Sequence, residues 1–112
     1  MSDGRKQSPL AEYPDVWVEF KQSGYPFKLS RTLDKSKDAT ETIRIILGYV
    51  TAWNMTDVDG AMVELPDRGG RTPEILDNVD EALTTWFVKA FYENRADIIK
   101  SKNSLPPSPS TS

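Results

Sequence analysis

The chain has 112 residues, 38% of them hydrophobic, and a formal net charge of −3. This length fits one domain, and a mildly acidic, evenly mixed charge lacks the basic surface that attracts nucleic acids or anionic membranes. No apolar run approaches the roughly 20 residues of a membrane span, and no apolar segment near the N-terminus predicts a secretory signal. Cysteine and histidine are absent, which excludes disulfides and thiolate metal sites and removes the commonest catalytic base. We therefore expect a non-enzymatic cytoplasmic protein that has no catalytic, cofactor-binding or metal-binding residues.

The two ends of the chain carry few apolar side chains. Over residues 1–12 the only sizeable ones are Met1 and Leu10, and residues 101–112 are rich in serine and proline. Such segments cannot bury enough apolar surface to offset the backbone entropy lost on ordering, roughly 1–2 kcal/mol per residue. We expect disordered tails over 1–12 and 101–112, and a single α+β domain over 13–100.

The ordered part opens with a strand pattern. Over residues 16–20, β-branched or aromatic side chains occupy every second position, as in a strand with one buried face. A glycine-containing turn at 22–24 follows, and the alternation resumes over residues 25–31. These features predict an N-terminal β-hairpin. Pro26 has no amide donor, so we expect the second strand to lie at the sheet edge or to begin after this residue.

A helical period begins after residue 37. Asp38 or Thr40 can cap the free amides of the first turn, and Glu41 stands where the helix dipole favours an acid. Apolar side chains then recur three or four residues apart along one helix face. They are Ile43, Ile46, Leu47, Val50 and Trp53. The pattern predicts a helix over about 38–53.

A second helix is expected near the C-terminus, over about 73–97. It follows a turn at 55–60, a short strand at 61–65 and a flexible glycine-containing loop. Thr72 followed by Pro73 suits the start of a helix, and Asn78 with Glu81 suits a second capping box, so the helix can break near residue 77. The predicted fold is thus α+β, an N-terminal β-hairpin packed on two main helices.

The string Asp57-Val58-Asp59-Gly60 resembles part of a calcium-binding loop. When Gly60 is aligned with the glycine of such a loop, Met55 falls where the first carboxylate is needed and Pro66 where the bidentate glutamate is needed. A turn is the better interpretation.

Aromatic side chains are frequent in the predicted domain. We expect Trp53, Trp86 and Phe87 to lie in the core. Interleaved aromatic and basic residues over 17–31 would also suit single-stranded nucleic acid, but the acidic net charge favours aromatics that fill a core. Trp17 falls on the strand face opposite its apolar neighbours, so either the sheet is covered on both sides or one face binds a partner.

Three strings resemble a known family. VWV at 16–18, GYPFKL at 24–29 and WNMTDVDG at 53–60 are similar to strings in small tail-assembly proteins of long-tailed bacteriophages. The third, placed before a short strand and a closing helix, resembles that of tail assembly chaperones. The resemblance covers residues 16–91. It implies a protein of the host cytoplasm that coats the tape-measure protein, recruits tail-tube subunits and leaves before the tail is complete.

Two alternatives stay open. The predicted hairpin departs from mostly helical chaperones, which leaves a structural neck or tail component retained in the virion as one alternative. A small nucleic-acid-binding module is the other. Under the chaperone interpretation we expect Val16, Trp17, Tyr25 and Phe27 to contact the partner. A small core also favours self-association into a homo-oligomer.

Overall fold

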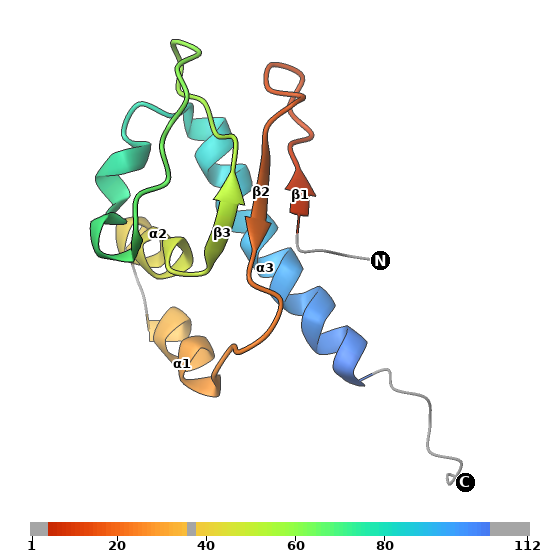
Figure 1. Cartoon of the computed structure of the whole chain (residues 1–112). Coiled ribbons are helices and arrows are strands. Elements are labelled where there is room, and N and C mark those ends of the chain that lie inside the picture. The colour runs from red at the N-terminus through yellow and green to blue at the C-terminus, as the bar shows by residue number, and fades with distance from the viewer. Residues whose placement is uncertain (1–4, 36–37, 104–112) are drawn as a thin grey trace, which may run out of the picture.

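A computed structural model describes residues 5–35 and 38–103, and it has the predicted α+β class. In these described residues three strands form one sheet, accompanied by three α-helices and two short 3-10 helices (Figure 1). The strands are β1 (Arg5–Gln7), β2 (Trp17–Phe20) and β3 (Val50–Trp53). The helices are α1 (Phe27–Lys35), α2 (Ala39–Leu47), η1 (Arg68–Gly70), η2 (Pro73–Leu76) and α3 (Glu81–Asn103). None of the described helices is both long and apolar enough to cross a membrane.

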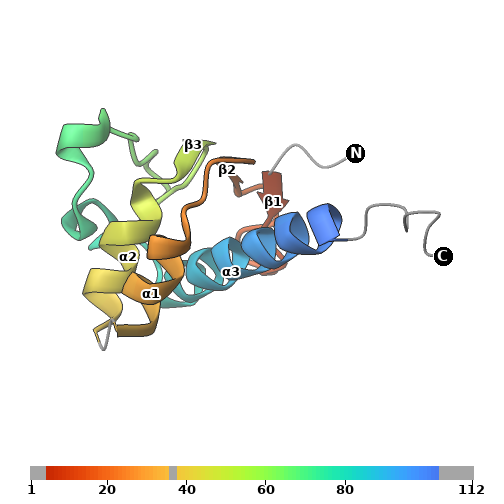
Figure 2. The same cartoon turned by 90° about the horizontal axis from the view of Figure 1, so that it is seen from below.

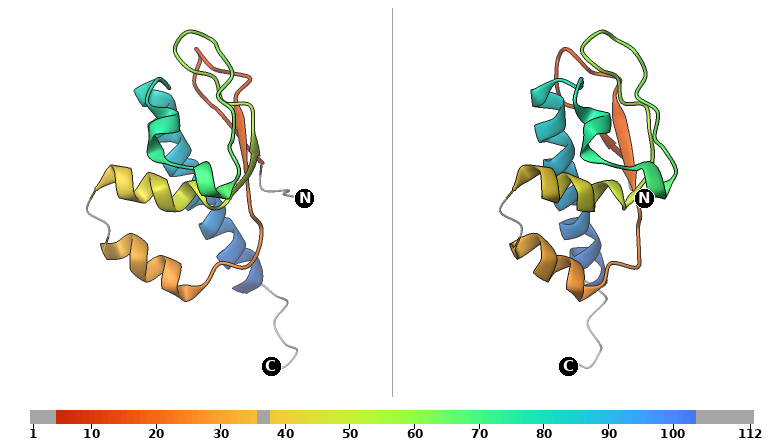
Figure 3. Two further views of the ribbon diagram at one scale, coloured as in Figure 1. Left: turned by 60° about the vertical axis from the view of Figure 1, so that its left-hand side comes forward. Right: turned by 90° about the vertical axis from the view of Figure 1, so that its left-hand side faces the viewer.

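The sheet is antiparallel in the order β1-β2-β3, and α3 covers one of its faces (Figure 2). Val18 pairs with Lys6 on one side and with Trp53 on the other, and the register of β2 and β3 shifts between Glu19 and Phe20. α1 and α2 lie on the same side of the sheet as α3, and α1 lies near the C-terminal half of α3 (Figure 3). Among the described elements, no helix lies on the opposite face of the sheet (Figure 2).

The core lies between β2 and α3. Val18 and Phe20 alternate with outward-facing residues and are almost completely buried. The Phe20 ring lies 5.9 Å from that of Phe87 and 5.6 Å from that of Phe91, in tilted and edge-to-face arrangements that aromatic pairs favour. Trp53, predicted to be a core residue together with Trp86 and Phe87, is buried too, and its ring packs edge-on against Phe87.

An N-terminal hairpin is present, as predicted, but only one of its two strands was predicted correctly. β2 forms where residues 16–20 were expected to form a strand, yet its hairpin partner is β1 and not residues 25–31. Most of that segment lies in α1, because Leu29 and Leu33 are four residues apart and both bury on one helix face. The predicted disorder of residues 1–12 is therefore wrong from Arg5 onward, and residues 1–4 lie outside the described chain.

The first predicted helix is shorter than the period suggested. Asp38 caps α2, its carboxylate accepting a hydrogen bond from the Thr40 amide at 2.9 Å, as expected. The helix ends at Leu47, however, and Gly48 leads into β3, so the last residues of the predicted 38–53 helix are extended. The short strand predicted at 61–65 was wrong too, since only an isolated bridge between Thr56 and Met62 forms there.

The predicted break near residue 77 is confirmed. η2 follows Thr72, and α3 begins separately at Glu81. The cap of α3 is Asp80 rather than Asn78, since the Asp80 carboxylate accepts a hydrogen bond from the Ala82 amide at 2.8 Å. α3 continues to Asn103, beyond the predicted end at 97, so the disordered tail predicted from 101 was wrong for its first three residues. Residues 104–112 lie outside the described chain.

One arginine joins the end of α2 to β3. Arg71 donates from Nη1 to the carbonyls of Leu47 and Val50, at 3.1 and 2.8 Å, and from Nε to that of Pro66 at 2.7 Å. Carbonyl groups in the α2–β3 connection and in the following loop thus share one guanidinium. A half-buried charge with three carbonyl partners stabilises this connection.

Candidate protein-binding groove

A groove of about 290 Å³ lies between the start of α1 and the last turns of α3. Its lining is mainly apolar and includes Tyr25, Phe27, Ser30, Arg95, Ile98 and Ile99. An apolar hollow with few polar groups, placed between two helices, is typical of sites that receive a side chain or a helix of a partner.

Phe27 is exposed because of its position on α1. Leu29 and Leu33 bury on one face of the helix, and Phe27 precedes Leu29 by two residues, about 200° around the axis. Its side chain is 77% exposed, and Ile99 on the opposite wall is 51% exposed. Large apolar side chains gathered at the rim of a groove are a sign of a binding surface, whereas scattered ones are ordinary.

Tyr25 forms the inner wall of the groove. Gly24, with a positive φ of 79°, turns the chain after β2 and brings the Tyr25 ring to 4.9 Å from Tyr49 and 6.1 Å from Phe91. Its hydroxyl donates to the Lys21 carbonyl at 2.6 Å. Burial raises the pKa of the Tyr25 phenol to about 12. This ring is therefore held in one orientation from both of its ends.

Arg95 supplies the charge on the α3 wall. Its guanidinium donates from Nη2 to the Ser30 hydroxyl at 2.6 Å and so links α3 to α1 across the inner end of the groove. A guanidinium has five N–H donors, and the Arg95 side chain makes this one hydrogen bond among the described residues. The remaining donors can serve a carboxylate or a carbonyl of a bound segment.

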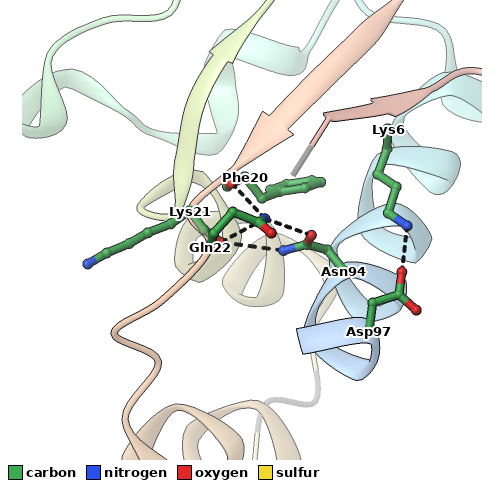
Figure 4. Close-up of polar contacts among 6 residues, drawn as sticks. All are labelled: Lys6, Phe20, Lys21, Gln22, Asn94 and Asp97. Atoms are coloured by element: carbon green, nitrogen blue, oxygen red, sulfur yellow. Dashed lines mark hydrogen bonds and ion pairs between the residues drawn. The ribbon is translucent and has the colours of Figure 1, made fainter. Parts of the chain in front are cut away.

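A polar cluster beside the groove fixes α3 against the end of β2 (Figure 4). Asn94 is 1% exposed; its Oδ1 accepts from Gln22 Nε2 at 3.0 Å, and its Nδ2 lies 3.4 Å from the Lys21 carbonyl. Three residues further along α3, Asp97 forms an ion pair of 2.9 Å with Lys6 of β1. Gln22 donates to Asn94, and Asn94 donates to the Lys21 carbonyl, so these two amides, which do not titrate, position α3 beside Arg95 without offering chemistry of their own.

The structure separates the four predicted contact residues. Tyr25 and Phe27 meet in the groove. Val16 is 5% exposed and belongs to the core, so it offers little surface. Trp17 lies on the helix-free face of the sheet, half-buried, with the Arg5 guanidinium 3.8 Å above its ring centre.

The α3 wall was not predicted as part of a site. Arg95, Ile98 and Ile99 fall at the end of a long helix whose apolar stripe was interpreted only as core. Their one signal was a pair of isoleucines that extends the apolar stripe of α3 past the well-buried Phe91. That these residues face α1 depends on the tertiary fold. It could not be predicted, because the segment that forms α1 was expected to be a strand.

The string at 53–60 has local structural roles. Asn54 extends the ladder of β2 by accepting from the Trp17 amide at 2.7 Å and donating to the Asp15 carbonyl at 2.8 Å. Asp57 Oδ1 accepts from the amides of Asp59 and Ala61 at 2.9 and 3.0 Å. Its carboxylate thus closes a turn, in agreement with the turn interpretation. Within residues 5–35 and 38–103 no three acidic side chains lie close enough together to hold a metal ion.

Comparison with protein-family models, with curated proteins and with solved structures finds no match for this chain.

Proposed function

We propose that this protein is a non-enzymatic binding protein that receives an apolar segment of another protein in the groove between α1 and α3. The observation that carries the proposal is the pairing of Phe27 with Ile99 across an apolar hollow. In water these side chains are exposed at a free-energy cost that a partner would remove, at about 25 cal/mol per Å² of apolar surface buried. A sequence without histidine or cysteine is consistent with binding as the whole activity.

The resemblance of three sequence strings to tail-assembly proteins specifies the partner. We propose that the protein is a phage tail assembly chaperone, which acts in the host cytoplasm and binds the tape-measure protein through this groove. Several copies coat one tape measure, self-associate along it and recruit tail-tube subunits. A groove on each small subunit suits a long partner that must be covered by many copies and later released.

The test is co-expression with the tape-measure protein of the same phage, followed by affinity purification and light scattering. The proposal predicts a soluble complex with many copies of this chain per tape measure. Phe27→Ser and Ile99→Ser should each reduce the amount of soluble tape measure. Met62→Ser is the matched control, because Met62 is 61% exposed and lies outside the groove.

Two results would contradict the proposal. In the first, the tape measure stays insoluble while this chain elutes alone. In the second, Met62→Ser reduces the amount of soluble complex as much as Phe27→Ser does. The second result would show that general surface apolarity, and not the groove, keeps the tape measure soluble.

A further inference from the structure

We infer that the groove accepts an acidic amphipathic helix, with apolar side chains seated between α1 and α3 and carboxylates lying along α1. This inference rests on the proposed function and specifies the chemistry of the bound segment. It starts from the charges around the groove, which differ in sign from the chain as a whole.

The solvent-facing side of α1 is basic. Lys28, Arg31 and Lys35 are exposed, and with Thr32 they line a shallow hollow on this helix. Their spacing of three and four residues puts them on one side, over two turns. Within the described residues none of these three cations lies in an ion pair with a carboxylate. A chain with a net charge of −3 thus presents a concentrated positive stripe here.

The basic stripe borders the groove. Arg31 follows Phe27 by four residues, so the two stand one above the other on α1. Across the groove Arg95 adds a cation from α3. The apolar centre is therefore flanked by cations on both walls. An amphipathic helix with acidic flanks complements that arrangement in both shape and charge.

Acidic groups do not cancel this charge. Asp34, the one acid on α1, follows Ser30 by four residues and so lies on the groove side, where the two cations Arg31 and Arg95 outnumber it. On α3, Asp97 faces β1 through its ion pair with Lys6. Glu93 lies four residues earlier, hence on the same side of α3 as Asp97. The groove side of both helices therefore carries more positive than negative charge.

Two synthetic helical peptides provide the direct probe. They share one leucine face, and one carries glutamate on its flanks where the other carries lysine. Titrated into the isotope-labelled full chain, the glutamate peptide should shift the amide signals of Ser30, Arg95 and Ile98. Its dissociation constant should be at least about tenfold lower than that of the lysine peptide, and the difference should shrink with added salt.

Charge reversal on α1 sharpens the test. The triple variant Lys28→Glu, Arg31→Glu, Lys35→Glu should weaken binding of the glutamate peptide by roughly tenfold and strengthen binding of the lysine peptide. Two single changes form a matched pair. Arg31→Glu should weaken binding of the glutamate peptide by about threefold. Lys89→Glu, at an exposed position elsewhere on α3, should weaken it by less than about 1.5-fold. All of these positions are exposed, so the variants should fold.

Equal affinity for the two peptides would overturn the inference. So would displacement of the glutamate peptide by a single-stranded oligonucleotide that binds α1, since the stripe would then serve nucleic acid. If wild type and triple variant keep the tape measure equally soluble, the proposed function stands and this inference fails. If the acidic peptide binds as described but the tape measure stays insoluble, the inference stands and the proposed function fails.

Discussion

The sheet with α3 and the helix α1 are built in different ways. In the first region, β2 is paired on both sides, and the rings of Phe20, Phe87 and Phe91 interlock beneath it. α1 is attached to the body by two buried leucines and by the bond of Ser30 to Arg95. Within the described residues no helix or strand packs extensively against α1.

The difference indicates how one small chain combines a fixed body with an adaptable wall. The aromatic side chains that hold the body together are fully buried, whereas the phenylalanine of α1 is left in solvent. A helix with few tertiary contacts opens at a lower free energy than the core does. We therefore expect the α1 side of the groove to adjust to a partner while the α3 side keeps its position.

Matched leucine truncations should show the largest contrast. Leu83 of α3 is 0% exposed and Leu33 of α1 is 7% exposed, so their substitutions by alanine remove the same atoms from two buried sites. Leu83→Ala should lower the free energy of unfolding by about 4 kcal/mol, because the rigid core cannot collapse around the cavity. Leu33→Ala should lower it by about 2 kcal/mol, since α1 can shift inward. Urea denaturation measures both, and equal losses would contradict the distinction between the two regions.

Two arginines sharpen the contrast for polar contacts. Arg71 makes three bonds to backbone carbonyls, whereas Arg95 makes one bond to a hydroxyl. Arg71→Met should lower the free energy of unfolding by about 2 kcal/mol, as it leaves partly buried carbonyls without a donor. Arg95→Met should lower it by less than about 1 kcal/mol. Thermal unfolding of the two variants compares these losses of stability. A larger loss for Arg95→Met than for Arg71→Met would mean that α1 is essential to the stability of the body.

The exposed rim of the groove should tolerate change. Phe27→Ser and Ile99→Ser remove side chains that are mostly in solvent, so each should alter the free energy of unfolding by less than about 0.5 kcal/mol. Circular dichroism during urea denaturation checks this, with Met62→Ser as the control outside the groove. Loss of the folded signal in Phe27→Ser would show that this side chain belongs to the core.

The Tyr25 phenol should make stability depend on alkaline pH. Its pKa is raised from 10.0 to about 12 in the folded protein, so the unfolded chain releases this proton first. The resulting stabilisation is complete below pH 10 and is lost as the pH rises toward 12. Tyr25→Phe removes the group, and its stability should fall less steeply than that of the wild type across this interval. Parallel slopes in urea titrations above pH 10 would show that the phenol is not held neutral by burial.

Several elements were predictable because their signals are local. The alternation of β2, the Asp38 cap of α2 and the break before α3 depend on residues within one or two turns of one another. β1 has no such signal, because a three-residue strand of charged and polar side chains is defined only by its pairing with β2. The apolar spacing of α2 continues in the sequence through Val50 and Trp53, but Gly48 ends the helix and the β-branched pair Val50-Thr51 follows.

The groove was half predictable. Tyr25 and Phe27 were predicted to contact the partner because exposed aromatic side chains on an edge hairpin are typical anchors for association, and both line the groove. They were placed on a strand, however, since Tyr25, Phe27 and Leu29 alternate over a stretch too short to distinguish a strand from the first turn of a helix. Leu33 was the missing observation, as its spacing of four from Leu29 indicates a helix. Without α1 in place, the α3 wall could not be inferred.

The central claim, that the groove receives the partner, is tested most directly by mapping the bound surface. Amide signals of the isotope-labelled chain would be followed while a soluble fragment of the proposed partner, the tape-measure protein, is added. The account predicts shifts along residues 25–31 and 95–99, with the signals around Trp17 unchanged. Shifts confined to Arg5, Trp17 and Glu19 on the helix-free face of the sheet, with the groove unaffected, would contradict it.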